Sequence, residues 1–574
     1  MKCTIEYHIL IHFFESLKET KSRKMKQFLT ILIALVLFYQ ANSQITERER
    51  PKEWDNLAEG ARFLDRFLPI PAIGKLKTAD WGTKEVVKRY VDNGIEENEW
   101  SYWGGNILKE NGKYHLFVCR WPENAEKGHM EWPRSMVVHA VADNSFGPFK
   151  VVQEIGKGHN PETFKLASGG YIIYVIDGHY YSENIDGPWE YRKFEFNARD
   201  RKIPDGLSNL TFAQREDGSY IMMCRGGSIW FSKNGQSEYN LVTPERVYPP
   251  YDGRYEDPVI WKTNIQYHMI VHDWYGRIAY YMRSMDGINW KLEPGEAYVP
   301  GLVVYEDGTR EEWFKYERIK MLQDEYGRAT QANFAVIDTL KHYDFGSDNH
   351  SSKNLGIPLT VGKLITILDK EKITDETQKI RVKVQAEEGF NPRKDMDIES
   401  LRFGASEEVN FGRGCKVIDI EKDGKDLILV FEGKGNGITE DNFAAKLLGK
   451  TSKGNLLFGY ARLPWLDYLQ SALSARLPKL FVDNKACTAQ VEIQNFGQTE
   501  SENAEVIVEV KTRRQRQLGK AQIPPLKSFE KTLIQIDGVS DAMKNEMVDV
   551  TVHINHPNQE PIVLSGKVIA TANW

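Results

Sequence analysis

The stretch WGGNILKENGKYHLFVCRW (103–121) decides the fold, because four related stretches follow it along the chain. They are HNPETFKLASGGYIIYVID (159–177), SNLTFAQREDGSYIMMCRG (208–226), EDPVIWKTNIQYHMIVHD (256–273) and YERIKMLQDEYGRATQANFAVI (316–337). Each combines a short apolar strand, a turn with Gly or Asn, and a second strand rich in Tyr, Ile, Val or Met, which indicates an antiparallel hairpin. Self-similarity at a period of roughly 40 to 50 residues is typical of propeller blades. The repeats predict a five-bladed β-propeller.

The residues at the start of each repeat are polar or acidic, or carry an aromatic ring. In a propeller these heads surround one central channel, so we expect them to form a common site. The heads are Trp103 to Asn106, His159 to Glu162, Ser208 with Asn209, Glu256 to Pro258, and Glu317 with Arg318.

At 574 residues the chain is too long for a single core, and a net charge of -6 gives no basic surface for nucleic acid. We expect an all-β protein: a five-bladed β-propeller followed by two β-sandwich modules, the second immunoglobulin-like. Alternating apolar and polar runs such as KIRVKVQAE (379–387) and TAQVEIQNF (488–496) predict the sandwiches. The expected divisions are a lead-in packing on the propeller (45–99), the propeller (100–345), a β-sandwich (346–470) and the immunoglobulin-like β-sandwich (471–574).

Residues 1–44 are expected to be an upstream extension followed by a secretory signal peptide that begins at Met25. MKQFLTILIALVLFYQANSQ (25–44) has a Lys, an apolar run and a small-residue end, and the run is too short for a membrane span of about 20 residues. The predicted location is therefore secreted or periplasmic. Cys119, Cys224, Cys415 and Cys487 are expected to be buried free thiols.

Two carboxylates head different repeats. Asp257 is followed by Pro258, which fixes the backbone, although Asp before Pro also commonly caps a turn. Glu317 is followed by Arg318, and the pair could be a surface ion pair with no other role. Two carboxylates facing one cavity are the equipment for hydrolysis of a glycosidic bond. We therefore expect Asp257 and Glu317 to be catalytic, with Glu256 and His159 as further catalytic candidates.

Other head residues are expected to bind substrate. His159 could bind a hydroxyl or donate a proton, and a structural histidine is equally compatible. Inward-facing Arg120, Arg225 or Arg318 would favour a substrate with carboxylate or sulfate groups. The expected substrate-binding residues are Trp103, Asn106, Asn160, Glu162, Asn209, Arg318, Trp274 and Arg120. No organic cofactor is expected, and no ligand motif indicates a metal, although a structural Ca²⁺ in the central channel is compatible with a propeller.

The motifs WGGN, HNPE, YEDPVIW and YERIKML resemble bacterial glycoside hydrolases of the five-bladed propeller superfamily that includes family 43, in particular secreted members with EDP and ERP motifs. The likeness covers about Trp100 to Ile337. Family 43 places an Asp base at the head of the first blade, where this chain has Trp103 to Asn106, and Ile319 replaces the Pro of ERP. The resemblance therefore matches only Asp257 and Glu317 to motif carboxylates. The base could instead be Glu256, Glu162, Glu99 or His159.

Together these features predict a secreted glycoside hydrolase that cleaves plant or marine algal oligosaccharides, exo-acting and inverting. Glu317 is the expected general acid, and Asp257 the base or a carboxylate that orients the base. One alternative is a polysaccharide lyase that relies on His159 and Arg318, and another is a catalytically inactive glycan-binding protein. The expected partner is an oligosaccharide or polysaccharide, with no nucleic acid and no membrane span; the sequence does not indicate an oligomeric state.

Overall fold

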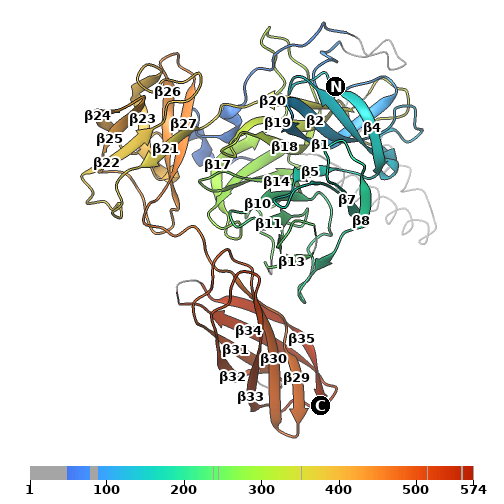
Figure 1. The fold of residues 1–574 in the computed structure, drawn as a ribbon, viewed down its shortest axis with the longest axis vertical. Coiled ribbons are helices and arrows are strands. Elements are labelled where there is room, and N and C mark those ends of the chain that lie inside the picture. The colour runs from blue at the N-terminus through green and yellow to red at the C-terminus, as the bar shows by residue number, and fades with distance from the viewer. Residues whose placement is uncertain are drawn as a thin grey trace, which may run out of the picture.

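The protein is all-β and consists of a propeller and two sandwiches (Figure 1). The computed structural model describes residues 48–77, 88–236, 238–243, 245–350, 352–512, 515–557 and 560–572. The expected signal segment lies outside these residues. Among the described residues, no helix is long and apolar enough to cross a membrane.

The propeller has five blades arranged around one axis, which confirms the expected fold. In the first four blades, consecutive antiparallel strands run outward from the axis. Blade one contains β1 (Trp100–Glu110), β2 (Lys113–Pro122), β3 (Met136–Ala142) and β4 (Lys150–Lys157), and blade two contains β5 (Glu162–Lys165), β6 (Tyr171–Val175), β7 (Gly178–Ser182) and β8 (Glu190–Lys193). Blade three contains β10 (Thr211–Gln214), β11 (Tyr220–Met223), β12 (Ile229–Ser232), β13 (Tyr239–Leu241) and the edge strand β9 (Phe196–Asn197). Blade four contains β14 (Tyr255–Lys262), β15 (Tyr267–Asp273), β16 (Ile278–Ser284) and β17 (Lys291–Tyr298).

The fifth blade and the lead-in close the ring. This blade contains β18 (Lys315–Gln323), β19 (Ala329–Ile337) and β20 (Ser352–Pro358). Lead-in residues Ile95 and Phe67 form antiparallel bridges to Asn354 and Leu359 at the free side of β20. The lead-in therefore supplies pairing where a fourth strand would lie, and it covers an otherwise exposed edge. Because β20 pairs with β19, the propeller extends past the expected boundary at 345.

Aromatic side chains fill the spaces between blades. Tyr174 of blade two stacks on Phe212 of blade three with ring centroids 4.3 Å apart, and Phe164 lies 5.3 Å from both Phe212 and Tyr220. Such pairs contribute about 0.5–1.5 kcal/mol beyond the burial of their area. Much of the aromatic content of the repeats therefore stabilises the propeller.

The first sandwich packs against the lead-in and blade four. Arg283 of β16 donates to Glu293 Oε1 within the propeller and to Ser406 Oγ at 2.8 Å across the boundary. The elements of the first sandwich are β21 (Lys363–Ile367), β22 (Lys379–Val384), β23 (Met396–Gly404), α3 (Ser406–Val409), β24 (Val417–Asp423), β25 (Asp426–Glu432), β26 (Ala444–Thr451) and β27 (Leu456–Arg462).

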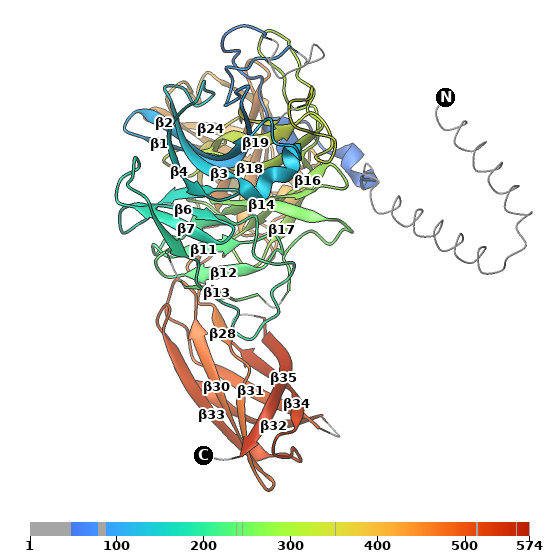
Figure 2. The same ribbon diagram turned by 90° about the vertical axis from the view of Figure 1, so that its right-hand side faces the viewer.

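The C-terminal sandwich lies below the propeller in both views, with β28 next to β13 of blade three (Figure 2). Arg199 joins the two bodies: it donates to Gln494 Oε1 and to the Ser474 carbonyl, each at 3.0 Å. The four expected free thiols are buried and unpaired. The strands of this sandwich are β28 (Leu473–Ala475), β29 (Lys479–Asp483), β30 (Ala486–Asn495), β31 (Ala504–Lys511), β32 (Gln515–Ile523), β33 (Lys531–Val539), β34 (Met547–Asn555) and β35 (Ile562–Ala572).

Candidate active site

The five blade heads share one backbone conformation. The second residue of every head has a positive φ, a conformation in which Gly, Asn and Asp are the usual residues. These residues are Gly104 (+62°), Asn160 (+53°), Asn209 (+55°), Asp257 (+55°) and Arg318 (+54°). The positive φ kinks the chain at this residue. In each head, the residue before the kink lines a wide cavity, and the kinked residue itself lines a narrow channel on the propeller axis.

The narrow channel is filled by contacts between blades. Asp257 accepts from Asn209 Nδ2 at 2.9 Å and from the Arg318 backbone N–H at 3.1 Å. Arg318 Nη1 also lies 2.8 Å from Asp257 Oδ1. Asp257 is 2% exposed and lines the channel rather than the wide cavity. It therefore joins blades three, four and five.

Two other expected site residues lie deeper and also join blades. Asn106 exchanges two hydrogen bonds with the backbone of Thr163 in blade two. Glu162 accepts from the Phe212 backbone N–H at 3.1 Å and forms an ion pair with Lys320. Neither residue lines the wide cavity. Their expected role in substrate binding is replaced by a role in holding the ring together.

The wide cavity, here called the funnel cavity, has a volume of about 270 Å³ at the mouth of the channel. Ten expected residues line it: Trp103, His159, Asn160, Ser208, Asn209, Arg225, Glu256, Trp274, Glu317 and Arg318. Arg120 does not; its guanidinium lies 3.9 Å from the Trp100 ring centroid.

Two walls of the funnel cavity were not predicted from the sequence. One is η3 (Gly128–Arg134), between β2 and β3, which contributes His129, Met130 and Trp132; the other is residues 340–342, which contribute Lys341 and His342. The second wall lies in a stretch that reads as a polar linker. The unusual length of the β2–β3 connection was the only available signal, because a loop-borne wall carries no strand periodicity.

Glu256 and Glu317 occupy equivalent positions on blades four and five but differ in their electrostatic surroundings. Burial raises the pKa of Glu256, and the nearby carboxylates of Asp257 and Glu317 raise it further. Burial acts in the same direction on Glu317, but Lys341 and Lys315 outweigh it and hold its pKa well below the usual range. The Lys315 ammonium lies 3.4 Å from Glu317 Oε1, and Lys341 contacts Oε2. The surroundings therefore shift the pKa values of the two carboxyl groups in opposite directions.

Two histidines of the funnel cavity, His159 and His129, have a lowered pKa, which favours their neutral form. Burial lowers the pKa of His159 well below its usual value, with Arg318 adding to the effect, and burial with Lys341 does the same for His129. His159 Nδ1 lies 3.0 Å from Ser135 Oγ. The Ser135 hydroxyl has the Trp132 and Gly158 carbonyls as acceptors, so Nδ1 is assigned as the donor and Nε2 as the acceptor.

Aromatic rings and one free amide complete the lining. Trp103 is fully buried, with the His129 ring centroid at 4.5 Å and Lys341 Nζ at 4.8 Å from its own. Trp274 is half-buried and has Lys315 Nζ 4.4 Å from its ring. Neither side-chain polar atom of Asn160 has a hydrogen-bond partner among the described residues. The exposed part of Trp274 is free to contact a ligand, and the buried Asn160 amide beside the cavity has unused hydrogen-bonding capacity.

Glu256, Asp257 and Glu317 also form the group best placed to hold a metal, since one oxygen of each lies within 4.8 Å of the others. Cations of the protein already pair with all three groups: Arg225 Nη2 lies 3.6 Å from Glu256 Oε2, Arg318 pairs with Asp257, and Lys315 and Lys341 pair with Glu317. Four cationic side chains paired with these carboxylates do not fit Ca²⁺, which takes a shell of six to eight oxygen ligands.

No protein-family model and no curated protein sequence matches the chain. Similar solved structures include a family 117 glycoside hydrolase from the marine bacterium Zobellia galactanivorans, with 10% identity over 51% of this chain and 89% of that one and a TM-score of 0.34. A protein described as a glycoside hydrolase shares 12% identity over 82% of this chain and 97% of its own, with a TM-score of 0.33. A thermostable family-43 glycoside hydrolase shares 13% over 49% and 95%, with a TM-score of 0.32. Identity at this level concerns the fold alone.

Proposed function

We propose that the protein is a glycoside hydrolase that uses Glu256 and Glu317 in the funnel cavity. The supporting observation is the opposite direction of their pKa shifts in one cavity. Two carboxyl groups whose surroundings drive their pKa values apart are the usual acid and base of such enzymes. Glu256, whose pKa is raised, is the general acid, and Glu317, whose pKa is lowered, is the second carboxylate. This reverses the role first expected for Glu317 and makes Asp257 a positioning residue.

The spacing of these carboxylates favours retention over the inversion expected from the sequence. One oxygen of each lies within 4.8 Å of the other. Inverting enzymes place the two carboxyl groups about 6.5–9.5 Å apart to admit a water molecule, so such a close approach of two oxygens supports retention. Retaining enzymes place them about 5–5.5 Å apart. Glu317 then attacks the anomeric carbon as the glycosidic C–O bond breaks, and the leaving oxygen takes the proton of Glu256. In the second step Glu256 removes a proton from water, whose oxygen displaces Glu317.

The shape and lining of the funnel cavity suggest its substrates. The walls from η3 and residues 340–342 narrow the opening, which suits the end of a glycan chain and thus exo-action. Trp274 offers a surface for a sugar ring, and the Asn160 amide offers bonds to hydroxyls. Plant or marine algal oligosaccharides remain the proposed substrate class, and the signal-like segment 25–44 supports export.

The test compares Glu256→Gln and Glu317→Gln on a panel of oligosaccharides and aryl glycosides. Glu99→Gln is the matched control, because Glu99, one of the bases considered from the sequence, is exposed and does not line the funnel cavity. Glu256→Gln should lose far more activity on oligosaccharides than on dinitrophenyl glycosides, because a good leaving group needs no proton. Glu317→Gln should lose activity on both, and NMR of the first product should show the starting anomeric configuration. Initial inversion, or equal losses for Glu99→Gln, would contradict the assignment. An unsaturated uronate product would indicate the lyase alternative, and binding without any product would indicate a glycan-binding protein.

A further inference from the structure

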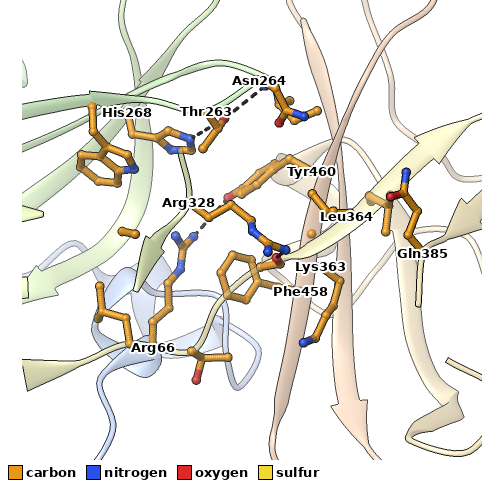
Figure 3. A pocket seen from close by; sticks show the side chains of 18 of the residues that line it. Arg66, Thr263, Asn264, His268, Arg328, Lys363, Leu364, Gln385, Phe458 and Tyr460 are labelled. Carbon is orange, nitrogen blue, oxygen red and sulfur yellow. Dashed lines mark hydrogen bonds between the residues drawn. The ribbon is translucent and has the colours of Figure 1, made fainter. Parts of the chain in front are cut away.

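A second cavity lies between the propeller and the first sandwich, and it shares no lining residue with the funnel cavity. This seam cavity has a volume of about 110 Å³ and is lined by the lead-in, by blades four and five, and by β21 and β27. Figure 3 shows Arg66 of η2 (Phe63–Arg66) directed toward the Tyr460 hydroxyl, with Arg328 and Phe458 beside it. The cavity is small, so a ligand larger than one ring would have to extend out of its opening.

Arg66 is a buried cation without a carboxylate partner. It is 6% exposed, and no Asp or Glu among the described residues lies within ion-pair distance of it. Its Nε has no hydrogen-bond partner, and Nη2 has only a long contact of 3.4 Å to Tyr460. The guanidinium carbon lies 4.2 Å from the Phe458 ring and 4.5 Å from the Phe63 ring. Aromatic faces stabilise an arginine but supply no countercharge, so the site still favours an anion.

The neighbourhood of Arg66 carries excess positive charge. Lys446 is buried and bonded to Asn410 and the Ala61 carbonyl rather than to a carboxylate, and Arg283 is matched by Glu293. The same field acts on Tyr460: burial raises its pKa, but Lys446 and Arg66 outweigh burial and lower it. A neutral hydroxyl whose pKa is lowered in a buried site reports a positive potential there.

The remaining lining offers both apolar and polar contacts. Trp261 and Phe458 present rings that are almost fully buried. Asn264 and Gln385 line the opening, and neither side-chain amide has a hydrogen bond from another described side chain. An unmatched guanidinium, flat rings and free amides are the groups that recognise a carboxylate, a ring face and hydroxyls.

We propose that the seam cavity binds a uronic acid residue whose carboxylate is held by Arg66. The site is distinct from the funnel cavity and does not depend on Glu256 or Glu317 being catalytic. Binding across the seam places contacts on both bodies, so the ligand also strengthens the contact between the propeller and the first sandwich.

The experiment is calorimetric titration of the full chain with D-galacturonate and D-glucuronate, and with D-galactose and D-glucose as neutral matches. The uronates should bind at least tenfold more tightly than the neutral sugars. A parallel titration with trigalacturonate shows whether the ligand is a free sugar acid or the end of a glycan chain. Tighter binding of the trisaccharide than of D-galacturonate would indicate the chain end. Uronates that bind no more tightly than the neutral sugars would overturn the proposal.

Variants locate the binding. Thr366 lines the seam cavity at an exposed position, so Thr366→Trp fills the cavity without disturbing the core and should abolish uronate binding. Arg66→Met should weaken uronate binding at least tenfold and leave the neutral sugars unaffected. Arg225→Ala, in the funnel cavity, is the matched control and should retain binding. Binding that survives Thr366→Trp, or that survives a folded Arg66→Met, overturns the proposal, as does loss in Arg225→Ala alone. Should Arg66→Met fail to fold, Thr366→Trp decides.

Discussion

Arg318 and Asp257, each at the kinked position of its blade head, form a buried ion pair with Nη1 and Oδ1 2.8 Å apart on the propeller axis. The carboxylate also accepts the Arg318 backbone N–H, so the contact fixes both the side chain and the backbone of blade five. Asp257, which the sequence suggests is catalytic, therefore forms a structural contact at the centre of the propeller.

Asp257→Asn should destabilise the propeller. The variant leaves the Arg318 guanidinium buried without its carboxylate, which costs about 3 kcal/mol or more. For a domain of this size the expected fall in Tm is roughly 6–12 °C, measured by calorimetry. The exposed Lys113–Asp143 pair provides the control, since Asp143→Asn should cost less than about 1 kcal/mol. Loss of activity with an unchanged Tm would instead make Asp257 a catalytic base.

Lys341→Met should move the pH profile of kcat/KM to higher pH. Lys341 lowers the pKa of Glu317 and also acts to lower that of Glu256. Removing its charge therefore raises both values. The acid limb, where Glu317 must ionise, and the alkaline limb, where Glu256 must stay protonated, should both shift upward by on the order of one pH unit. Lys113→Met, at an exposed site, should leave the profile in place, and an unshifted profile for Lys341→Met would separate Glu317 from the chemistry.

The repeats were sufficient to predict the propeller, but not the separate roles of residues within one head. Glu256 and Asp257 are adjacent in sequence, and only the positive φ at Asp257 directs one side chain to the cavity and the other to the axis. The five kinked positions hold Gly, Asn, Asn, Asp and Arg, and an Arg in this conformation carries no recognisable signature.

The limits of the site were the least predictable part. Lys341 and Trp132 reach the funnel cavity from connections, whose course depends on tertiary packing rather than on local periodicity. The closing strand β20 follows a polar stretch that resembles a linker, so the expected boundary fell before it. Pairing of β20 with the lead-in, which is distant in sequence, determines the true boundary.

Stability should fall as pH rises through the neutral range because of an acidic cluster behind the funnel wall. Burial raises the pKa of Glu123 to about 8, with Asp344 adding to the effect and Ser101 opposing it. A carboxyl whose folded pKa is raised above its unfolded value stabilises the fold at low pH. That contribution is lost between about pH 4.5 and pH 8. Glu123→Gln should therefore flatten the dependence of Tm on pH in this window and be more stable than the parent at pH 8. Equal slopes for the two proteins would contradict the assignment.

Gly128→Ala should loosen the η3 wall of the funnel cavity. Gly128 has a φ of +50°, and a Cβ there would lie 2.0 Å from the Asp344 carbonyl oxygen, so η3 must move away from residues 344–345. His129, Met130 and Trp132 follow on the same element and line the cavity, so the expected result is a raised KM with a smaller change in kcat. Gly112→Ala is the matched control: its φ is +75°, but nothing lies within 4 Å of the added Cβ. The control carries a similar backbone strain of about 1 kcal/mol and should leave KM unchanged. Equal effects of the two substitutions on KM would mean that strain alone, rather than the position of η3, controls substrate binding.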